Sequence, residues 1–214
     1  MRVAVPDATI RTQAEAALEA AGQQNMGQLM MALVAELGKE QQAETIRQQA
    51  GMYVKMLLTA QDESIKQAKM HQWSMVEPPT KAQIKATLLQ VLHSESQAAR
   101  HTAALIIGKM GAIELPTDQW PEMLQALLEN ITGNFADGTK VVSLEALGYM
   151  CELWEPEDMN QQQTNQILTC IVDGIRADRP DSIRFAAAVA LSNSLYFTKN
   201  NFDSKDERDM IMQV

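Results

Sequence analysis

A phrase that recurs four times along the chain constrains the fold more than any other feature. Each copy places a basic residue three positions before a small one, and an apolar run with helical spacing follows. The copies read IRQQAGMYVKMLL, ARHTAALIIGKMG, TKVVSLEALGYMC and IRFAAAVALSNSL. Their basic residues are Arg47, Arg100, Lys140 and Arg184, and their small residues are Ala50, Ala103, Ser143 and Ala187. The basic residues lie 53, 40 and 44 positions apart, which is typical of repeat proteins.

Another amphipathic segment precedes each copy, so the repeating unit is a pair of helices. We expect helices at about 7–21, 26–39, 43–59, 63–74, 80–92, 96–111, 119–131, 138–153, 162–177, 182–199 and from 205 onward. The extra helix at 63–74 accounts for the longer first spacing. One such pair cannot bury its apolar face alone, whereas stacked pairs form a continuous core. The sequence therefore predicts an all-α fold: a right-handed α-solenoid of HEAT repeats, with about five helix pairs and the start of a sixth.

The repeated phrase also predicts how neighbouring helices are joined. The small residue lets paired helices approach closely. The basic residue before it is expected to bind a carboxylate or the carbonyl groups of the adjoining repeat. Polar residues ahead of several helices are expected to act as N-caps. These candidate caps are Asp7, Thr80, Thr117 or Asp118, and Asp181.

The charge balance limits the classes of partner. The 214 residues carry a formal net charge of −9, whereas binding to phosphates needs clustered Lys and Arg, so the sequence predicts no nucleic-acid partner. An acidic surface suits a basic protein partner, although solubility alone also explains it. No apolar run approaches the roughly 20 residues that cross a bilayer, so no membrane span is expected. Cys151 and Cys170 each lie in an apolar helical stretch, which predicts buried free thiols.

The residue patterns of enzymes are missing from the sequence. The Gly-Lys-Met-Gly stretch at 108–111 lacks the strand and the spacing of a phosphate-binding loop. His71, His93 and His101 have no Cys or His at ligand spacing, so neither a metal nor another cofactor is predicted. The two cysteines are better explained as core thiols than as nucleophiles. We therefore expect no enzyme and no catalytic residues, but a curved surface that binds other proteins.

Several longer phrases resemble a known family. QWPEMLQALLENIT, SLEALGYMCE, NQILTCIVDGIR, ALSNSLYFTKNNF and ERDMIMQV resemble, in this order, the N-terminal repeats of the importin-β (karyopherin-β) family. The resemblance runs from about Ala43 to Val214, and more faintly from Arg11. It implies a single solenoid segment, 1–214, of a larger receptor. The family's N-terminal region would occupy about 11–92, and further HEAT repeats about 96–214.

The family consists of nuclear transport receptors, so the resemblance implies a role in nuclear protein import. Such a receptor would be found in the cytoplasm, in the nucleus and at the nuclear pore in the nuclear envelope. The implied partners are the small GTPase Ran in its GTP form, bound by the inner helices, and Phe-Gly nucleoporins, bound on the outer surface. The importin-α adaptor or cargo would bind only through later repeats that this chain lacks. The alternative is a non-transport HEAT-repeat scaffold that assembles a multiprotein complex.

The nucleoporin pocket of the family lies between two outer helices, which match NQILTCIVDG and DERDMIMQV here. The matching residues are Leu168, Thr169 and Val172 on the first helix and Glu207, Met210 and Ile211 on the second. Each trio lies on one helical face, and two such faces side by side would accept a phenylalanine ring, with Glu207 holding a peptide N–H. Met210 and Val172 stand where the family commonly has Phe and Ile, so the pocket's shape would differ. The alternative is that these residues only pack the two helices together.

The resemblance also implies contacts with Ran-GTP on the inner helices. The candidate residues are Lys55, Asp62, Lys109, Glu145 and Glu152. The family commonly has Lys-Asn where this chain has Lys55-Met56, which removes one polar contact. The alternative for each candidate is an ordinary solvated side chain.

Overall fold

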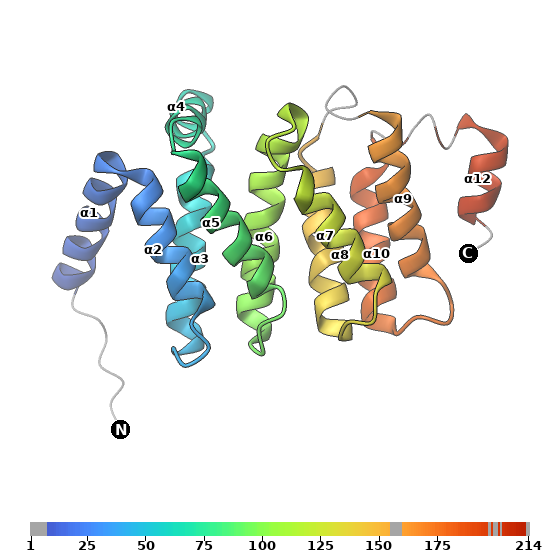
Figure 1. The fold of residues 1–214 in the computed structure, drawn as a ribbon, viewed down its shortest axis with the longest axis horizontal. Coiled ribbons are helices and arrows are strands. Elements are labelled where there is room, and N and C mark those ends of the chain that lie inside the picture. Colours follow the sequence, from blue (N-terminus) through green and yellow to red (C-terminus); the bar gives the residue numbers. More distant parts are fainter. Residues whose placement is uncertain (1–7, 155–159, 197, 199–200, 202, 213–214) are drawn as a thin grey trace.

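The structure is a computed structural model that describes residues 8–154, 160–196, 198, 201 and 203–212. All regular elements in these ranges are helical (Figure 1). They are α1 (Ala8–Gln24), α2 (Met26–Gly38), α3 (Glu44–Leu58), α4 (Glu63–Ser74), α5 (Pro78–Val91), α6 (Gln97–Glu114), the 3-10 turn η1 (Leu115–Thr117), α7 (Pro121–Thr132), α8 (Asp137–Cys151), α9 (Gln161–Ile175), α10 (Asp181–Ser194) and α12 (Lys205–Met212). The expected range of α4 is confirmed, whereas α10 ends at Ser194 rather than at residue 199.

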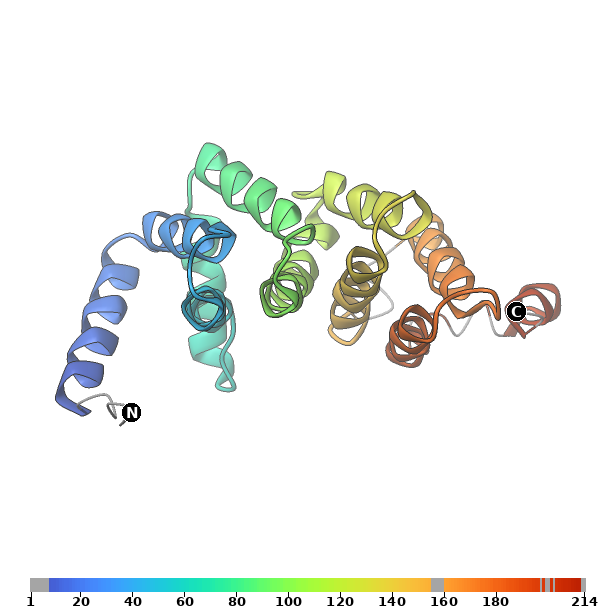
Figure 2. The same ribbon diagram turned by 90° about the horizontal axis from the view of Figure 1, so that it is seen from below.

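The helices stack in two rows (Figure 2). The outer row contains α2, α5, α7 and α9, and the inner row contains α3, α6, α8 and α10. Each outer helix packs against the inner helix that follows it, and each inner helix packs against the next inner helix. The prediction of an α-solenoid built from stacked helix pairs is therefore confirmed.

Small residues set the spacing between helices. A Cβ added at Gly51 of α3 would lie 2.4 Å from Cγ2 of Thr102 on α6. One added at Gly174 of α9 would lie 2.8 Å from Cβ of Ala187, a small residue of the repeated phrase on α10. Because any larger residue would force these helices apart, the chain places glycine at the closest approaches.

In three helices the N-cap is a different residue from the one expected. α5 starts at Pro78 and α7 at Pro121, since a proline ring fixes φ at a helical value and has no N–H that needs a partner. α10 follows Pro180. The candidate caps that prove wrong are Thr80, Thr117, Asp118 and Asp181. Asp7, the remaining candidate, lies outside the described residues.

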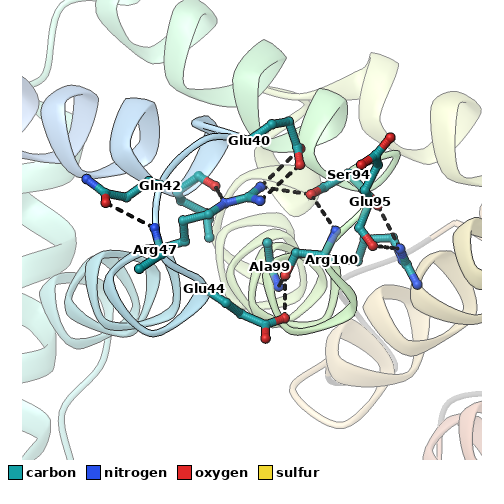
Figure 3. Close-up of polar contacts among 11 residues, drawn as sticks. Glu40, Gln42, Glu44, Arg47, Ser94, Glu95, Ala99 and Arg100 are labelled. Atoms are coloured by element: carbon teal, nitrogen blue, oxygen red, sulfur yellow. Dashed lines mark hydrogen bonds and ion pairs between the residues drawn. The ribbon is translucent and has the colours of Figure 1, made fainter.

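Arg47 joins the first two pairs of the stack (Figure 3). Its buried guanidinium donates through Nε to the Leu37 carbonyl at 2.8 Å, and through Nη1 and Nη2 to the Glu40 carboxylate at 3.0 and 3.1 Å. Nη2 also donates to Oγ of Ser94 in the next pair, at 2.8 Å. The predicted link between adjoining repeats is therefore confirmed at this position.

The same prediction is wrong at two later copies of the phrase. Nη1 of Arg100 donates to the carbonyls of Ser94 and Glu95 at 2.7 and 3.1 Å, both in the turn before its own helix. Arg184 forms an ion pair with Asp181 of its own helix at 3.3 Å. Both arginines bind acceptors in or directly before their own helix, and not acceptors in the adjoining repeat. Arg100 nevertheless touches the next pair, because a Cβ added at Gly138 would lie 2.8 Å from its Nη2.

Two further features belong to the core and the surface. Cys151 and Cys170 are buried free thiols, as the sequence predicts. Burial raises the pKa of Cys151 to about 12, and burial followed by the charge of Asp173 raises the pKa of Cys170 to about 11. No helix in the described part of the chain combines the length and the apolar character needed to cross a bilayer.

Candidate protein-binding surfaces

Most of the candidate Ran residues lie on helices of the inner row. Lys55 on α3, Lys109 on α6 and Glu145 on α8 are half-buried, whereas Glu152 is exposed directly after α8. Asp62 precedes α4 and is also exposed. Three successive inner helices thus each carry one half-buried charged candidate.

Glu145 is the best-defined part of this inner surface. Its Oε2 lies 2.5 Å from Nδ1 of His101, so a polar contact joins α8 to α6. Tyr149 and Glu152 follow at helical spacing, and the pKa of Tyr149 is raised by burial and by the charges of Glu145 and Glu152. A Cβ added at Gly108 would lie 2.4 Å from Cβ of Tyr149, so α6 and α8 almost touch here. The contacts therefore gather two predicted residues around a histidine and a tyrosine that the sequence reasoning missed.

The spacing of residues 145, 149 and 152 is the signal that could have found Tyr149. Positions i, i+4 and i+7 lie on one face of a helix, so the tyrosine must share the face of the two glutamates. His101 had no such local signal, because its partner is 44 positions away. Only the packing of α6 on α8 brings them together.

Asp62 and Lys55 also have local structural roles at the end of α3 and the start of α4. Oδ1 of Asp62 accepts from the Ile65 N–H at 3.1 Å and from Oγ of Ser64 at 2.5 Å, and so caps α4. The hydrogen bond from Ser64 is the main reason that the pKa of Asp62 is lowered. The carbonyl of Lys55 accepts from Oγ1 of Thr59 at 3.0 Å. Capping alone accounts for the aspartate, whereas the lysine ammonium is not used in these contacts.

The three residues of the first trio of the candidate nucleoporin pocket differ in exposure and in their neighbours. Leu168 is 5% exposed yet lies outside the main core cluster, and Val172 is half-buried. Thr169 is exposed and lines an open groove of about 570 Å³ against α7, together with Leu128 and Cys170. One edge of the trio therefore faces the preceding outer helix.

The second trio lies on α12, but the side chains of Glu207, Met210 and Ile211 lie outside the described residues. What the structure places is the approach to this helix. Nδ2 of Asn201 donates to Oδ1 of Asn165 at 2.8 Å, and Nε2 of Gln161 donates to Oδ1 of Asn201 at 3.3 Å. These amides join residue 201 to the first turns of α9, and no local pattern in the sequence predicted them.

The chemistry open to these surfaces is recognition by shape and charge. Across the described residues, no group of three or more His, Cys, Asp or Glu side chains is placed to hold a metal ion. Both thiols are protonated at neutral pH because their pKa values are raised. The inner row carries half-buried charged residues, and the outer row offers clefts between consecutive helices.

The chain is similar in sequence to curated proteins that share one name. It is 37% identical over 210 residues to importin subunit beta-1 of Schizosaccharomyces pombe and 36% identical over 209 residues to importin subunit beta-1 of Arabidopsis thaliana. These alignments cover 98% and 97% of this chain, and 24% of each relative. The chain therefore spans about a quarter of the length of the curated relatives that it matches. No protein-family model matches it.

Solved structures agree with these relatives. Yeast importin-β (Kap95p) superimposes with a TM-score of 0.91 at 32% identity, over 99% of this chain and 25% of that one. The Kap95:Nup1 complex gives 0.89 at the same identity and coverage. A third structure, in which Kap95p binding induces the switch loops of RanGDP to adopt the GTP-bound conformation, gives 0.92, again at 32% identity over 99% and 25% of the two chains.

A stack of HEAT-type helix pairs, with clefts along its outer row, defines an α-solenoid. Over the quarter of its relatives' length that it spans, the chain is similar to importin subunit beta-1 in sequence and to yeast importin-β in structure. The resemblance expected from the sequence phrases is thereby confirmed.

Proposed function

We propose that the chain is part of a nuclear transport receptor, that its inner row binds Ran-GTP, that its outer row binds Phe-Gly nucleoporins, and that it catalyses no reaction. One observation carries the proposal: the chain superimposes along nearly its whole length on Kap95 in structures with Ran and with Nup1. Such a receptor works in the cytoplasm, in the nucleus and at the nuclear pore. Repeats beyond those in this chain would hold the importin-α adaptor or cargo.

The inner row suggests how Ran would act on a longer solenoid. α6 and α8 meet at the contact between Gly108 and Tyr149, and the pair of His101 and Glu145 joins them further along. A partner that spans these helices would change their spacing and hence the curvature of the stack. In the longer receptor, this change of curvature would lower the affinity for cargo. Because such coupling is reciprocal, bound cargo would lower the affinity for Ran by the same factor.

Ran selectivity for its nucleotide state tests the proposal most directly. We expect the chain to bind Ran loaded with a GTP analogue at least tenfold more tightly than Ran-GDP in isothermal titration calorimetry. Equal affinity for the two states would contradict the proposal. No binding to either state would favour the non-transport scaffold instead.

A matched pair of charge reversals would locate the Ran surface. Glu152→Arg changes an exposed residue after α8 of the inner row, whereas Glu129→Arg changes an exposed residue on α7 of the outer row. We expect the first to weaken binding of Ran-GTP by about three- to tenfold and the second to leave it within about twofold, as for rim charges in interfaces. The opposite order would place Ran on the outer row.

The nucleoporin surface needs a separate experiment. We expect Ile211→Asp on α12 to weaken binding of a Phe-Gly peptide by about tenfold or more, because a charge would meet the phenylalanine ring. Met75→Asp, at the exposed end of α4, is the matched control and should leave the affinity unchanged. Equal affinities of Ile211→Asp and the parent chain would remove α12 from the binding site.

A further inference from the structure

A groove on the outer row combines buried cations with apolar walls. It lies between α5 and α7, has a volume of about 550 Å³, and is lined by Lys81, Lys85, Leu89 and Trp120 among others. η1 and the turn after it connect α6 to α7, and the groove lies beside this connection. The groove is distinct from the inner surface and from the α9 and α12 region discussed above.

Two lysines in this groove share one carboxylate. Lys81 and Lys85 are 9% and 8% exposed, and Glu114 is 1% exposed. Lys85 forms an ion pair with Oε2 of Glu114 and donates to the Gln119 carbonyl at 2.9 Å. The other oxygen, Oε1, accepts from Nε1 of Trp73 at 2.7 Å. With two ammonium groups and one carboxylate, the buried cluster keeps one positive charge in excess.

Lys81 carries this excess charge. Its Nζ lies 3.8 Å from Oε1 of Glu114, too far for a hydrogen bond, and 5.0 Å from the ring centre of Trp73. Within the described residues its three N–H donors make no hydrogen bond that satisfies normal geometry. Burial is the main cause that lowers the pKa of Lys81, whereas the charge of Glu114 acts in the opposite direction. Glu122, the acidic residue among those lining the groove, is exposed, so water screens its charge.

The walls around this cation narrow the class of ligand. Trp120 is 3% exposed, with Nζ of Lys85 lying 5.4 Å from its ring centre, and Leu89 is half-buried. An inorganic anion would meet the charge but leave the apolar wall in contact with water. A carboxylate next to an apolar side chain would satisfy both.

We propose that the groove between α5 and α7 is a docking site for an acidic peptide segment of a partner protein. An Asp or Glu carboxylate of the peptide binds the Lys81 ammonium, and a neighbouring apolar side chain lies against Trp120 and Leu89. The site is separate from the surfaces assigned to Ran and to Phe-Gly repeats, and it does not depend on either assignment. The net charge of −9 would repel an acidic peptide from most of the surface. A local positive charge such as Lys81 is therefore needed to attract it.

The test uses a capped Gly-Leu-Asp-Glu-Leu-Gly peptide and its amide counterpart, Gly-Leu-Asn-Gln-Leu-Gly. Titration is followed by the indole N–H resonances in nitrogen-15 NMR spectra, where we expect the Trp120 resonance to shift with the acidic peptide. The amide peptide should bind at least about tenfold more weakly, the loss expected for a charged hydrogen bond. Equal binding of the two peptides, or no binding of the acidic one at millimolar concentration, would overturn the proposal. Inorganic phosphate that shifts the same resonance with equal affinity would also overturn it, in favour of a simple anion site.

Variants locate the contact. Lys81→Gln should weaken the acidic peptide at least about tenfold, while leaving the Lys85 and Glu114 pair in place. Lys66→Gln removes the same charge from the exposed face of α4 and should leave the affinity within about twofold. Ala82→Glu, on an exposed groove residue, supplies a tethered carboxylate and should block the peptide even if Lys81→Gln fails to fold. Unchanged affinity in Lys81→Gln, or in Ala82→Glu, would rule out this groove as the binding site.

Discussion

Arg47 concentrates more polar contacts than the other basic residues of the repeated phrase. It is 2% exposed and binds a carbonyl, a carboxylate and a hydroxyl, the last of these in the next helix pair. A planar guanidinium can serve all three directions at once, whereas a lysine ammonium at the end of a flexible stem cannot. The residue therefore ties two repeats together.

We predict that Arg47→Met lowers the free energy of unfolding by about 2–4 kcal/mol, because the buried Leu37 carbonyl and Ser94 hydroxyl lose their donor. Arg47→Lys should recover only part of this loss. Arg184→Met is the matched control at the same position of a later repeat, where the side chain forms one exposed ion pair. It should change stability by less than about 0.5 kcal/mol in urea unfolding followed by circular dichroism. Equal losses for Arg47→Met and Arg184→Met would show that burial of the guanidinium is unimportant.

The two cysteines should resist alkylation while the chain is folded. With pKa values of about 12 and 11, Cys151 and Cys170 are almost entirely protonated at pH 8, and the thiolate is the reactive form. We predict that iodoacetamide at pH 8 modifies the folded chain at least about a hundredfold more slowly than the chain in urea. Cys170, at a groove and with the lower pKa, should react before Cys151. Mass spectrometry would follow both sites, and rapid labelling of Cys151 in the folded chain would contradict the burial argument.

At the scale of helices, the inner row depends on close approach. Gly108 has no room for a methyl group, because its Cβ would lie 2.4 Å from Cβ of Tyr149 and 3.2 Å from the Ala146 carbonyl oxygen. We predict that Gly108→Ala lowers the free energy of unfolding by about 1–3 kcal/mol through overpacking. Gly22→Ala on α1 is the control, since its Cβ would meet side chains at an ordinary 3.4 Å, and it should stabilise the chain by up to about 1 kcal/mol. Thermal unfolding of both variants would decide whether steric contact or intrinsic helix propensity dominates.

The helix pairs were predictable because their apolar residues follow a local period. Helix starts were harder, since Pro78 and Pro121 replaced the expected polar caps. Contacts across the stack had no local signal at all. Trp73 and Glu114 are 41 positions apart, yet they form one buried hydrogen bond.

The same distinction between local pattern and contacts across the stack applies to the candidate binding residues. The placement of Lys55, Lys109 and Glu145 on inner helices followed from the repeat. The roles of Tyr149 and Asn201 did not, because they depend on how α8 meets α6 and how residue 201 returns to α9. The assignments to Ran and to nucleoporins stay predictions.

At the scale of the whole molecule, the two rows keep the proposed partners apart. Ran would bind the inner row, whereas the two grooves are lined mainly by residues of α5, α7 and α9, which belong to the outer row. Ligands on opposite sides do not compete for the same side chains. Any coupling between them must therefore pass through the packing between paired helices, as a change in the curvature of the stack.

Stability along such a stack should follow how many neighbours each helix has. α6 packs against α3, α5 and α8, and α8 packs against α6, α7 and α10. α1 packs mainly against α2, and none of its described side chains belongs to the buried apolar core. In a linear stack each unit is stabilised by its own folding and by its direct neighbours only. We therefore predict that amide hydrogen exchange is slowest in α6 and α8 and fastest in α1.

Native-state exchange followed by mass spectrometry would measure this gradient peptide by peptide. The exchange of α6 and α8 should report opening of the whole stack, whereas α1 should exchange through local opening at a lower free energy. Gly108→Ala sharpens the comparison, because it weakens the contact between α6 and α8. It should speed exchange in these two helices while leaving α1 unchanged. Uniform protection along the chain, or an equal response of α1 to this variant, would mean that the chain opens as one cooperative unit and not repeat by repeat.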